Sequence, residues 1–323
     1  MGQLLIGGSN GSRTPRHTRS ALRSGHLSGV ILFGSNIRSE DQLRGLSRSL
    51  QRAAHGTALV SVDQEGGLVQ RIPFAGPRQG QPSQGSATRV GRLARSAGRT
   101  LRRLGVNVNF APVADVPSGP RADIYGRAFR GSPSTVGKKV AAATRGYRRA
   151  RVAATAKHFP GLGVAARNTD DARVVITRGL RRLQRVDLVP FRSAVAVDVP
   201  LVMVSHALYP ALDRRRLASQ SRKIVTRLLR TRLGYEGAVV TDALEASAIR
   251  RGQSVAGAAE RSLLAGCDLL LLTQPASLRP VYRRLLARAR VSPRIRARLE
   301  ESVARVLVLK RSLGLRLAEP RAR

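Results

Sequence analysis

Short runs of apolar, often β-branched residues alternate along the chain with longer segments whose apolar positions recur at helical spacing. The apolar runs predict strands over residues 30–33, 58–62, 106–110, 152–156, 201–205, 238–241 and 268–272. Residues 3–6 are a weaker candidate for an eighth strand. Helical spacing is plain over 90–104, 135–150, 221–233, 255–265 and 294–313. Strands that alternate with helices favour a parallel sheet.

The distance between successive strands, roughly 30 to 50 residues, suits a (β/α)8 barrel of the TIM type. A doubly wound open sheet is the alternative that the same alternation allows. The segment 75–86 is rich in Gly, Pro and Gln and is expected to be a long loop, not a linker between domains. We therefore expect one α/β domain over residues 1–323, with a C-terminal helix at about 294–313.

Composition agrees with a soluble globular chain, but the charge is unusual. Hydrophobic residues make up 42% and charged residues 24%, while 58 basic and 19 acidic side chains leave a net charge of +39. The basic residues are almost all arginine, scattered over the polar faces of the predicted helices, and aromatic residues are 3% with no Trp. This pattern predicts nonspecific association with anionic polymers and no specific nucleic-acid binding.

Neither the single cysteine nor the histidines suggest a disulfide, a metal or a nucleotide cofactor. Cys267 lies in an apolar stretch, which is typical of a buried free thiol, and the five histidines are dispersed without ligand spacing. No apolar run is long enough to predict a transmembrane helix. Met1 leads directly into GQLLIGG, with no basic and apolar leader, so the chain as given is expected in the cytoplasm. A leader missing from this sequence would make the protein secreted or wall-associated.

Ionisable residues follow four of the predicted strands directly. Asp63 follows the predicted strand 58–62, and Lys157 and His158 follow the strand 152–156. His206 follows the strand 201–205, and Asp242 follows the strand 238–241. In a parallel barrel the carboxyl ends of all strands open on one face, where substrates bind. The sequence therefore predicts a polar site that gathers these side chains.

Five ordered segments carry a resemblance to a known family. They are SVDQEGGLVQRI (61–72), YGRAF (125–129), AKHFPGLG (156–163), MVSHALYPALD (203–213) and LGYEGAVVTDALEASAI (233–249). These segments resemble the signature blocks of family 3 glycoside hydrolases, most closely the single-domain β-N-acetylhexosaminidases. The resemblance implies a (β/α)8 barrel, no cofactor and retaining hydrolysis of β-linked N-acetylglucosaminides of the cell-wall type.

The resemblance also implies roles for named residues. Asp242 matches the nucleophile, and Asp63 the carboxylate that accepts hydrogen bonds from sugar hydroxyls. The other expected substrate-binding residues are Arg71, Arg127, Lys157, His158 and His206. Because the chain is so rich in arginine, the matches of Arg71 and Arg127 depend on the blocks around them.

One expected residue is missing. The family places its proton donor, a histidine, two residues after an aspartate; here the segment NTDDAR (168–173) has Asp170 at the aspartate and Ala172 at the histidine. Three readings follow. Asp170 or Asp171 is the acid, with its pKa raised by burial and by Asp242; His158 or His206 is recruited; or the chain is a catalytically impaired saccharide-binding barrel associated with anionic wall polymers.

Overall fold

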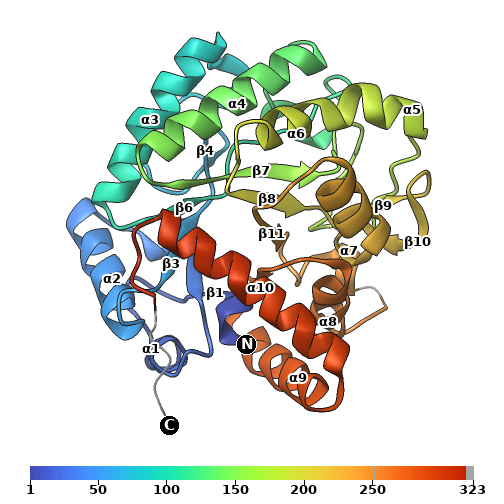
Figure 1. Cartoon of the computed structure of the whole chain (residues 1–323). Coiled ribbons are helices and arrows are strands. Elements are labelled where there is room, and N and C mark those ends of the chain that lie inside the picture. The colour runs from blue at the N-terminus through green and yellow to red at the C-terminus, as the bar shows by residue number, and fades with distance from the viewer. Residues whose placement is uncertain (251, 318–323) are drawn as a thin grey trace.

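Eight parallel strands form a nearly closed barrel ringed by helices in the computed structural model, which describes residues 1–250 and 252–317 (Figure 1). In order around the barrel the strands are β1 (Leu5–Gly8), β2 (Gly29–Leu32), β3 (Leu59–Val62), β6 (Val108–Asn109), β7 (Ala153–Phe159), β8 (Leu201–Val204), β11 (Ala238–Thr241) and β12 (Leu270–Leu272). β12 pairs with β1, and a bridge between Val240 and Leu269 joins β11 to the segment before β12. The predicted barrel is confirmed, and the alternative of an open sheet is excluded by this closure.

The longer helices lie on the outside of the barrel. They are α1 (Arg16–Arg23), α2 (Glu40–Ala53), α3 (Ala87–Arg103), α4 (Pro133–Arg149), α6 (Leu188–Val195), η7 (Lys223–Arg232), α8 (Val255–Ala265), α9 (Leu278–Val291) and α10 (Pro293–Ser312). Short turns α5 (Leu180–Arg182) and α7 (Ser247–Arg250) precede α6 and α8. Serines begin five of these helices, α2, α3, α4, α8 and α10, with the side-chain oxygen accepting a hydrogen bond from the first turn.

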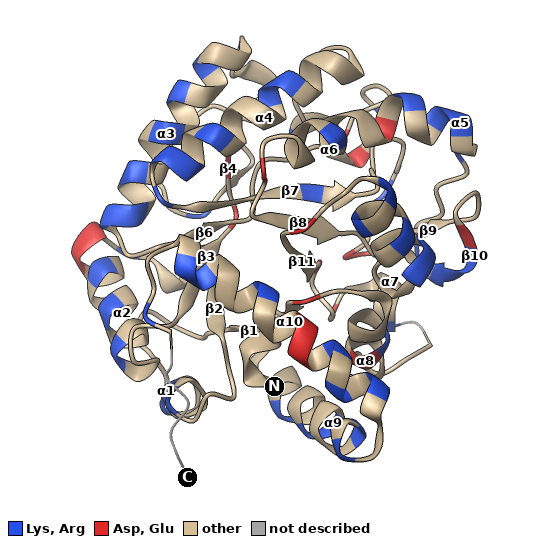
Figure 2. Ribbon diagram, in the orientation of Figure 1, with Lys and Arg blue, Asp and Glu red and all other residues tan. Residues whose placement is uncertain are grey.

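Helices α1, α2, α6 and α9 were not predicted. In α1 the buried positions are only Thr18 and Leu22, too few for a clear helical period. In α9, by contrast, the apolar residues at 278, 281, 282, 285 and 289 do recur at helical spacing, and the sequence analysis overlooked that pattern. Arginines occupy most of the outward positions, and Figure 2 shows the basic residues spread over the outer helices. The excess charge is therefore a property of the outside of the barrel.

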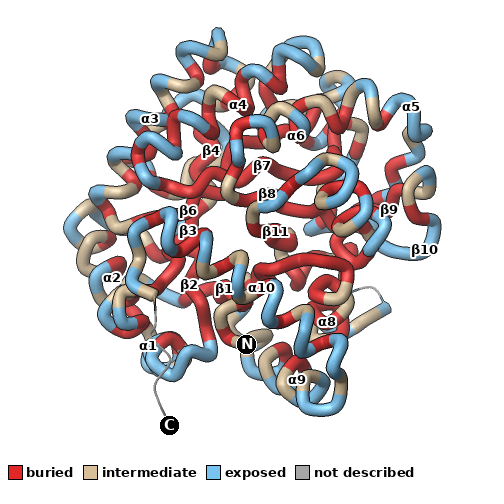
Figure 3. Tube along the Cα trace, in the orientation of Figure 1, coloured by how far each residue is buried: buried red, intermediate tan, exposed pale blue. Residues whose placement is uncertain are grey.

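The inside of the barrel is filled by apolar side chains. Ile6, Ile31, Leu59 and Phe110 pack there, and Figure 3 shows the strands as buried along the chain trace. Val306 and Leu309 of α10 join the same cluster, so α10 covers the amino-terminal end of the barrel. The opposite, carboxyl-terminal end is left for the site.

Two hairpins extend from the carboxyl ends of barrel strands. The hairpin β4 (Gln64–Gly66) with β5 (Val69–Gln70) follows β3, and β9 (Leu208–Tyr209) with β10 (Asp213–Leu217) follows β8. Gly66 has a φ of +92°, and a Cβ there would lie 2.4 Å from the Gln79 carbonyl oxygen of the adjoining loop.

Among the helices of the described residues, none combines the length and apolar character that crossing a membrane requires.

Candidate active site

A cavity of about 340 Å³ opens at the carboxyl end of the barrel and gathers nearly all of the predicted site residues. Its lining includes Asp63, Arg71, Arg127, Lys157, His158, Asp170 and Asp242. The side chains come from segments that lie far apart in the sequence, and the parallel strands bring them together. The loop that carries Asp170 therefore reaches the site.

Lys157 connects two carboxylates in the floor of the cavity. Its Nζ lies 2.6 Å from Oδ1 of Asp63 and 2.7 Å from Oε1 of Glu65, and Arg127 donates to both oxygens of Glu65 at 2.7 and 3.0 Å. Glu65 and Lys157 are almost fully buried. Burial raises the pKa of Glu65, but the charges of Lys157 and Arg127 outweigh it and lower that pKa to about 2. Glu65 and its two cationic partners, Lys157 and Arg127, are therefore all charged at neutral pH.

Glu65 had not been expected in this role, although it lies two residues after Asp63. That spacing is the signal that could have found it, because side chains two apart on an extended segment point to the same side. Its partners Lys157 and Arg127 are distant in sequence, so the pairing itself could not be read from the chain.

His158 is held by a buried carboxylate. Its Nδ1 lies 2.7 Å from Oδ2 of Asp115, whose Oδ1 accepts a hydrogen bond from the Leu162 backbone at 2.7 Å. Because Asp115 only accepts, Nδ1 carries the proton, and the ring lines the cavity with its orientation fixed. The sequence analysis missed Asp115; its one signal was a lone carboxylate in the apolar stretch after β6.

The structure places His206 behind the cavity, outside its lining. Its Nδ1 lies 2.8 Å from Oγ of Ser219, and its Nε2 lies 3.0 Å from the carbonyl oxygen of Ala243. A carbonyl can only accept, so Nε2 carries the proton. Burial lowers the pKa of His206, and the ring is neutral at physiological pH. His206 thus supports the backbone next to Asp242.

Asp242 lies directly after β11 and lines the cavity, half-buried. Its Oδ1 accepts a hydrogen bond of 2.8 Å from the backbone of Ala243. Burial raises the pKa of this carboxyl, but His158 and the hydrogen bond from the Ala243 N–H outweigh that effect and lower the pKa below its usual range. Asp242 is therefore ionised at neutral pH.

Asp170 lies at the mouth of the same cavity. Two backbone hydrogen bonds tie its loop to α7: Ser247 donates to the Asp170 carbonyl at 3.0 Å, and Ala248 to the Thr169 carbonyl at 3.1 Å. Asp170 is exposed, but desolvation by the surrounding protein and then the charge of Asp242 raise its pKa to about 6. Asp170 and Asp242 therefore have pKa values shifted in opposite directions.

The neighbours of Asp170 do not share its position. Asp171 is exposed, as Asp170 is, and Ala172 is buried, but neither neighbour is part of the cavity lining. Arg71, in contrast, lines the cavity with a buried Nε that has no hydrogen-bond partner in the described part of the chain. Residues 1–250 and 252–317 contain no group of three or more His, Cys, Asp or Glu side chains that could hold a metal ion.

Comparison with known proteins places this chain in a family. Residues 1–309 match the family model described as the glycosyl hydrolase family 3 N-terminal domain. A β-hexosaminidase of Stenotrophomonas maltophilia is 33% identical over 282 residues, which are 84% of each chain. An uncharacterized secreted glycosyl hydrolase of Arthroderma benhamiae is 34% identical over 286 residues, 84% of this chain and 80% of the relative.

Solved structures agree. The family 3 β-N-acetylglucosaminidase of Paenibacillus sp. superposes with a TM-score of 0.92 and 34% identity; the match covers 99% of this chain and 64% of that protein. The β-N-acetylhexosaminidase of Beutenbergia cavernae gives a TM-score of 0.89 and 29% identity, covering 96% of both chains. The chain therefore belongs to glycosyl hydrolase family 3, and it is a glycosyl hydrolase built on that family's N-terminal barrel.

Proposed function

We propose that this protein hydrolyses β-linked N-acetylglucosaminides with retention of configuration, with Asp242 as the nucleophile and Asp170 as the proton donor. The observation that carries the proposal is that Asp170 and Asp242 line one cavity. Their surroundings shift the two pKa values in opposite directions: that of Asp242 lies below its usual range, and that of Asp170 is raised to about 6. One carboxylate is ready to attack, and the other can hold a proton near neutral pH.

The reaction takes two steps. In the first, the Asp242 carboxylate attacks the anomeric carbon while Asp170 donates its proton to the leaving oxygen, which gives a glycosyl ester on Asp242. In the second, the Asp170 carboxylate takes a proton from water as that water attacks the anomeric carbon. The ester bond breaks, Asp242 is released, and Asp170 is protonated again.

Several features support a neutral sugar as the substrate. The cavity of about 340 Å³ lies within the range of small-molecule sites. Asp63 and Lys157 offer an acceptor and a donor for hydroxyl groups, and Arg71 contributes an unpartnered Nε–H. The specific sugar is inferred from relatives whose names record β-hexosaminidase or β-N-acetylglucosaminidase activity.

The geometry favours Asp170 over the other candidate acids. Both ring nitrogens of His206 contact protein atoms, and Asp171 and Ala172 lie outside the cavity lining. His158 does line the cavity, but its Nδ1–H is directed to Asp115. We therefore assign His158 to orienting the sugar.

The proposal is tested with 4-nitrophenyl and 2,4-dinitrophenyl β-N-acetylglucosaminides, with the matching glucosides and xylosides as controls. We expect the acetamido sugars to be preferred, the product to be the β-anomer by proton NMR, and Asp242→Asn to remove turnover. Binding of the sugar without cleavage of even the dinitrophenyl glycoside, which needs no proton donor, would instead favour the saccharide-binding barrel.

A further inference from the structure

Five arginines surround a cavity of about 320 Å³ between η7 and α10, away from the sugar cavity. They are Arg222, Arg230, Arg294, Arg298 and Arg305, and Glu301 is the acidic residue of the lining. The buried Asp268 lies beside them, where its backbone N–H donates to the Val239 carbonyl ahead of β12. This cluster is therefore at the amino end of the barrel, and Asp242 is at the carboxyl end.

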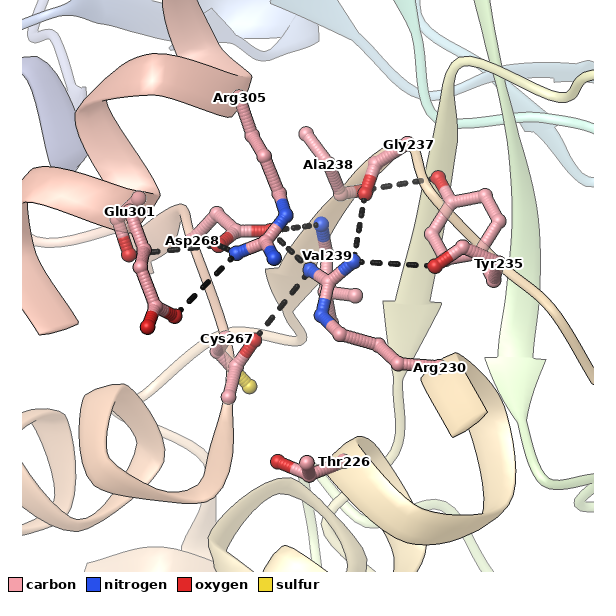
Figure 4. Close-up of polar contacts among 12 residues, drawn as sticks. Thr226, Arg230, Tyr235, Gly237, Ala238, Val239, Cys267, Asp268, Glu301 and Arg305 are labelled. Atoms are coloured by element: carbon pink, nitrogen blue, oxygen red, sulfur yellow. Dashed lines mark hydrogen bonds and ion pairs between the residues drawn. The ribbon is translucent and has the colours of Figure 1, made fainter. Parts of the chain in front are cut away.

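Asp268 fixes the positions of three of these arginines. Its Oδ2 accepts a hydrogen bond from Arg230, and its Oδ1 accepts from Arg298 at 2.7 Å and from Arg305 at 3.4 Å. Figure 4 shows Arg230 and Arg305 directed toward Asp268, with Glu301 beside them. The two carboxylates, Asp268 and Glu301, leave three of the five positive charges uncompensated.

Two donors in the cluster lack acceptors. Within the described residues, Nε of Arg230 and Nη1 of Arg298 are buried and have no hydrogen-bond partner. Nη1 of Arg298 lies 3.6 Å from Glu301, too far for a hydrogen bond. Buried donors normally have partners, so Arg230 and Arg298 keep unused hydrogen-bonding capacity in the lining of this cavity.

We propose that this arginine-lined cavity binds a phosphate group, either the free ion or a phosphate ester. A doubly charged tetrahedral oxyanion offsets most of the excess charge, and its oxygens suit the forked donors of guanidinium groups. The exposed Arg222 and Arg294 complete the rim. Because the site is remote from Asp242, occupancy leaves the sugar cavity open.

An adjoining cavity gives an ester somewhere to extend. Arg305 also lines a cavity of about 660 Å³ whose other residues include Val152, Val199, Val308 and Leu313. An apolar alcohol carried by the phosphate has room there. Comparing the binding of inorganic phosphate and hexyl phosphate therefore distinguishes a site for the free ion from a site for a phosphate ester.

The test is calorimetric titration of the full chain with each probe at pH 8 and constant ionic strength. The site variant is Arg222→Gln with Arg294→Gln. The matched control is Arg227→Gln with Arg311→Gln, which removes the same charge from exposed positions of η7 and α10 outside the cavity. We expect saturable binding that the site variant weakens about tenfold and the control changes by less than about twofold.

Glu301→Gln should change the affinity for phosphate in the opposite direction from the arginine substitutions. It removes the acidic side chain from the cavity lining, so we expect phosphate to bind about threefold more tightly. In the wild-type chain, the two probes are compared with each other. If hexyl phosphate binds more tightly than inorganic phosphate, the site is assigned to a phosphate ester; if inorganic phosphate binds more tightly, it is assigned to the free ion. The proposal would be overturned if both double variants lost affinity equally, or if neither probe bound saturably. Any phosphate binding would then be due to the overall positive charge of the surface.

Discussion

The Nζ atom of Lys157 lies 2.6 Å from Oδ1 of Asp63, although 94 residues separate the two in the chain. The same ammonium contacts Glu65 at 2.7 Å, so one buried cation holds two carboxylates in the floor of the sugar cavity. Such a network positions polar groups before the sugar arrives, which reduces the reorganisation that binding and catalysis require.

Replacing Lys157 with Met tests how far the fold depends on that network. The change leaves Glu65 buried with Arg127 as its remaining ion partner, and we expect the free energy of unfolding to fall by about 3–5 kcal/mol. Urea denaturation measures this loss. The control is Arg103→Met, which breaks an exposed pair with Glu40 and should hardly change stability. Equally small losses for both variants would show that the buried network contributes little.

Asp170→Asn should separate proton donation from nucleophilic attack. For glycosides with poor leaving groups we expect turnover to fall about 10²- to 10⁴-fold, whereas formation of the glycosyl intermediate from the dinitrophenyl glycoside should be little affected. Azide should accelerate the second step, because it needs no general base. Asp171→Asn is the matched control, since Asp171 is exposed and outside the cavity lining. The reverse ranking would assign the acid to Asp171.

The pH profile follows from the same two carboxylates. Asp170 must be protonated to donate, and its pKa is about 6, so kcat/KM should fall as the pH rises above about 6. Asp242 must be ionised, and its pKa lies below the usual 3.8, so the acidic limb should lie below that pH. The profile is measured with a poor leaving group in wild type and in Asp170→Asn. An alkaline limb that persists unchanged in the variant would rule out Asp170 as its origin.

Ala172→His examines the position where the family resemblance implies a histidine. Ala172 is 4% exposed and lies outside the cavity lining, so an imidazole there overpacks the loop. We expect a loss of about 1–3 kcal/mol in unfolding free energy and no increase in turnover. Ala166→His, at an exposed position of the same loop, should keep wild-type stability. A clear gain of turnover in Ala172→His would show that this loop can bring residue 172 into the cavity.

The strands could be predicted because parallel barrel strands are buried on both faces and appear as apolar runs. The predicted range 238–241 coincides with β11, whereas β6 is only Val108–Asn109 within the predicted 106–110. Long-range pairing could not be predicted. The contact between Asp115 and His158 spans 43 residues, and no local pattern records it.

Two histidines illustrate the limit for the site. His158 and His206 were both predicted as site residues because each lies near the end of a predicted strand. In the structure His158 lines the cavity, whereas His206 contacts Ser219 and Ala243. His158 lies within β7, while His206 lies two residues beyond β8. The direction of each ring therefore depends on its exact position relative to the strand end and on the side chains packed around it. The strand-end pattern in the sequence does not resolve either of these.

The most direct test of the central claim is covalent trapping of the nucleophile. A 5-fluoro N-acetylglucosaminyl fluoride keeps the acetamido group and has a leaving group that needs little acid assistance, so trapping does not depend on Asp170. Intact-protein mass spectrometry followed by peptide mapping locates the adduct. We predict one sugar per chain, on Asp242, and none in Asp242→Asn. Turnover without any adduct, or an adduct on another carboxylate, would contradict the account.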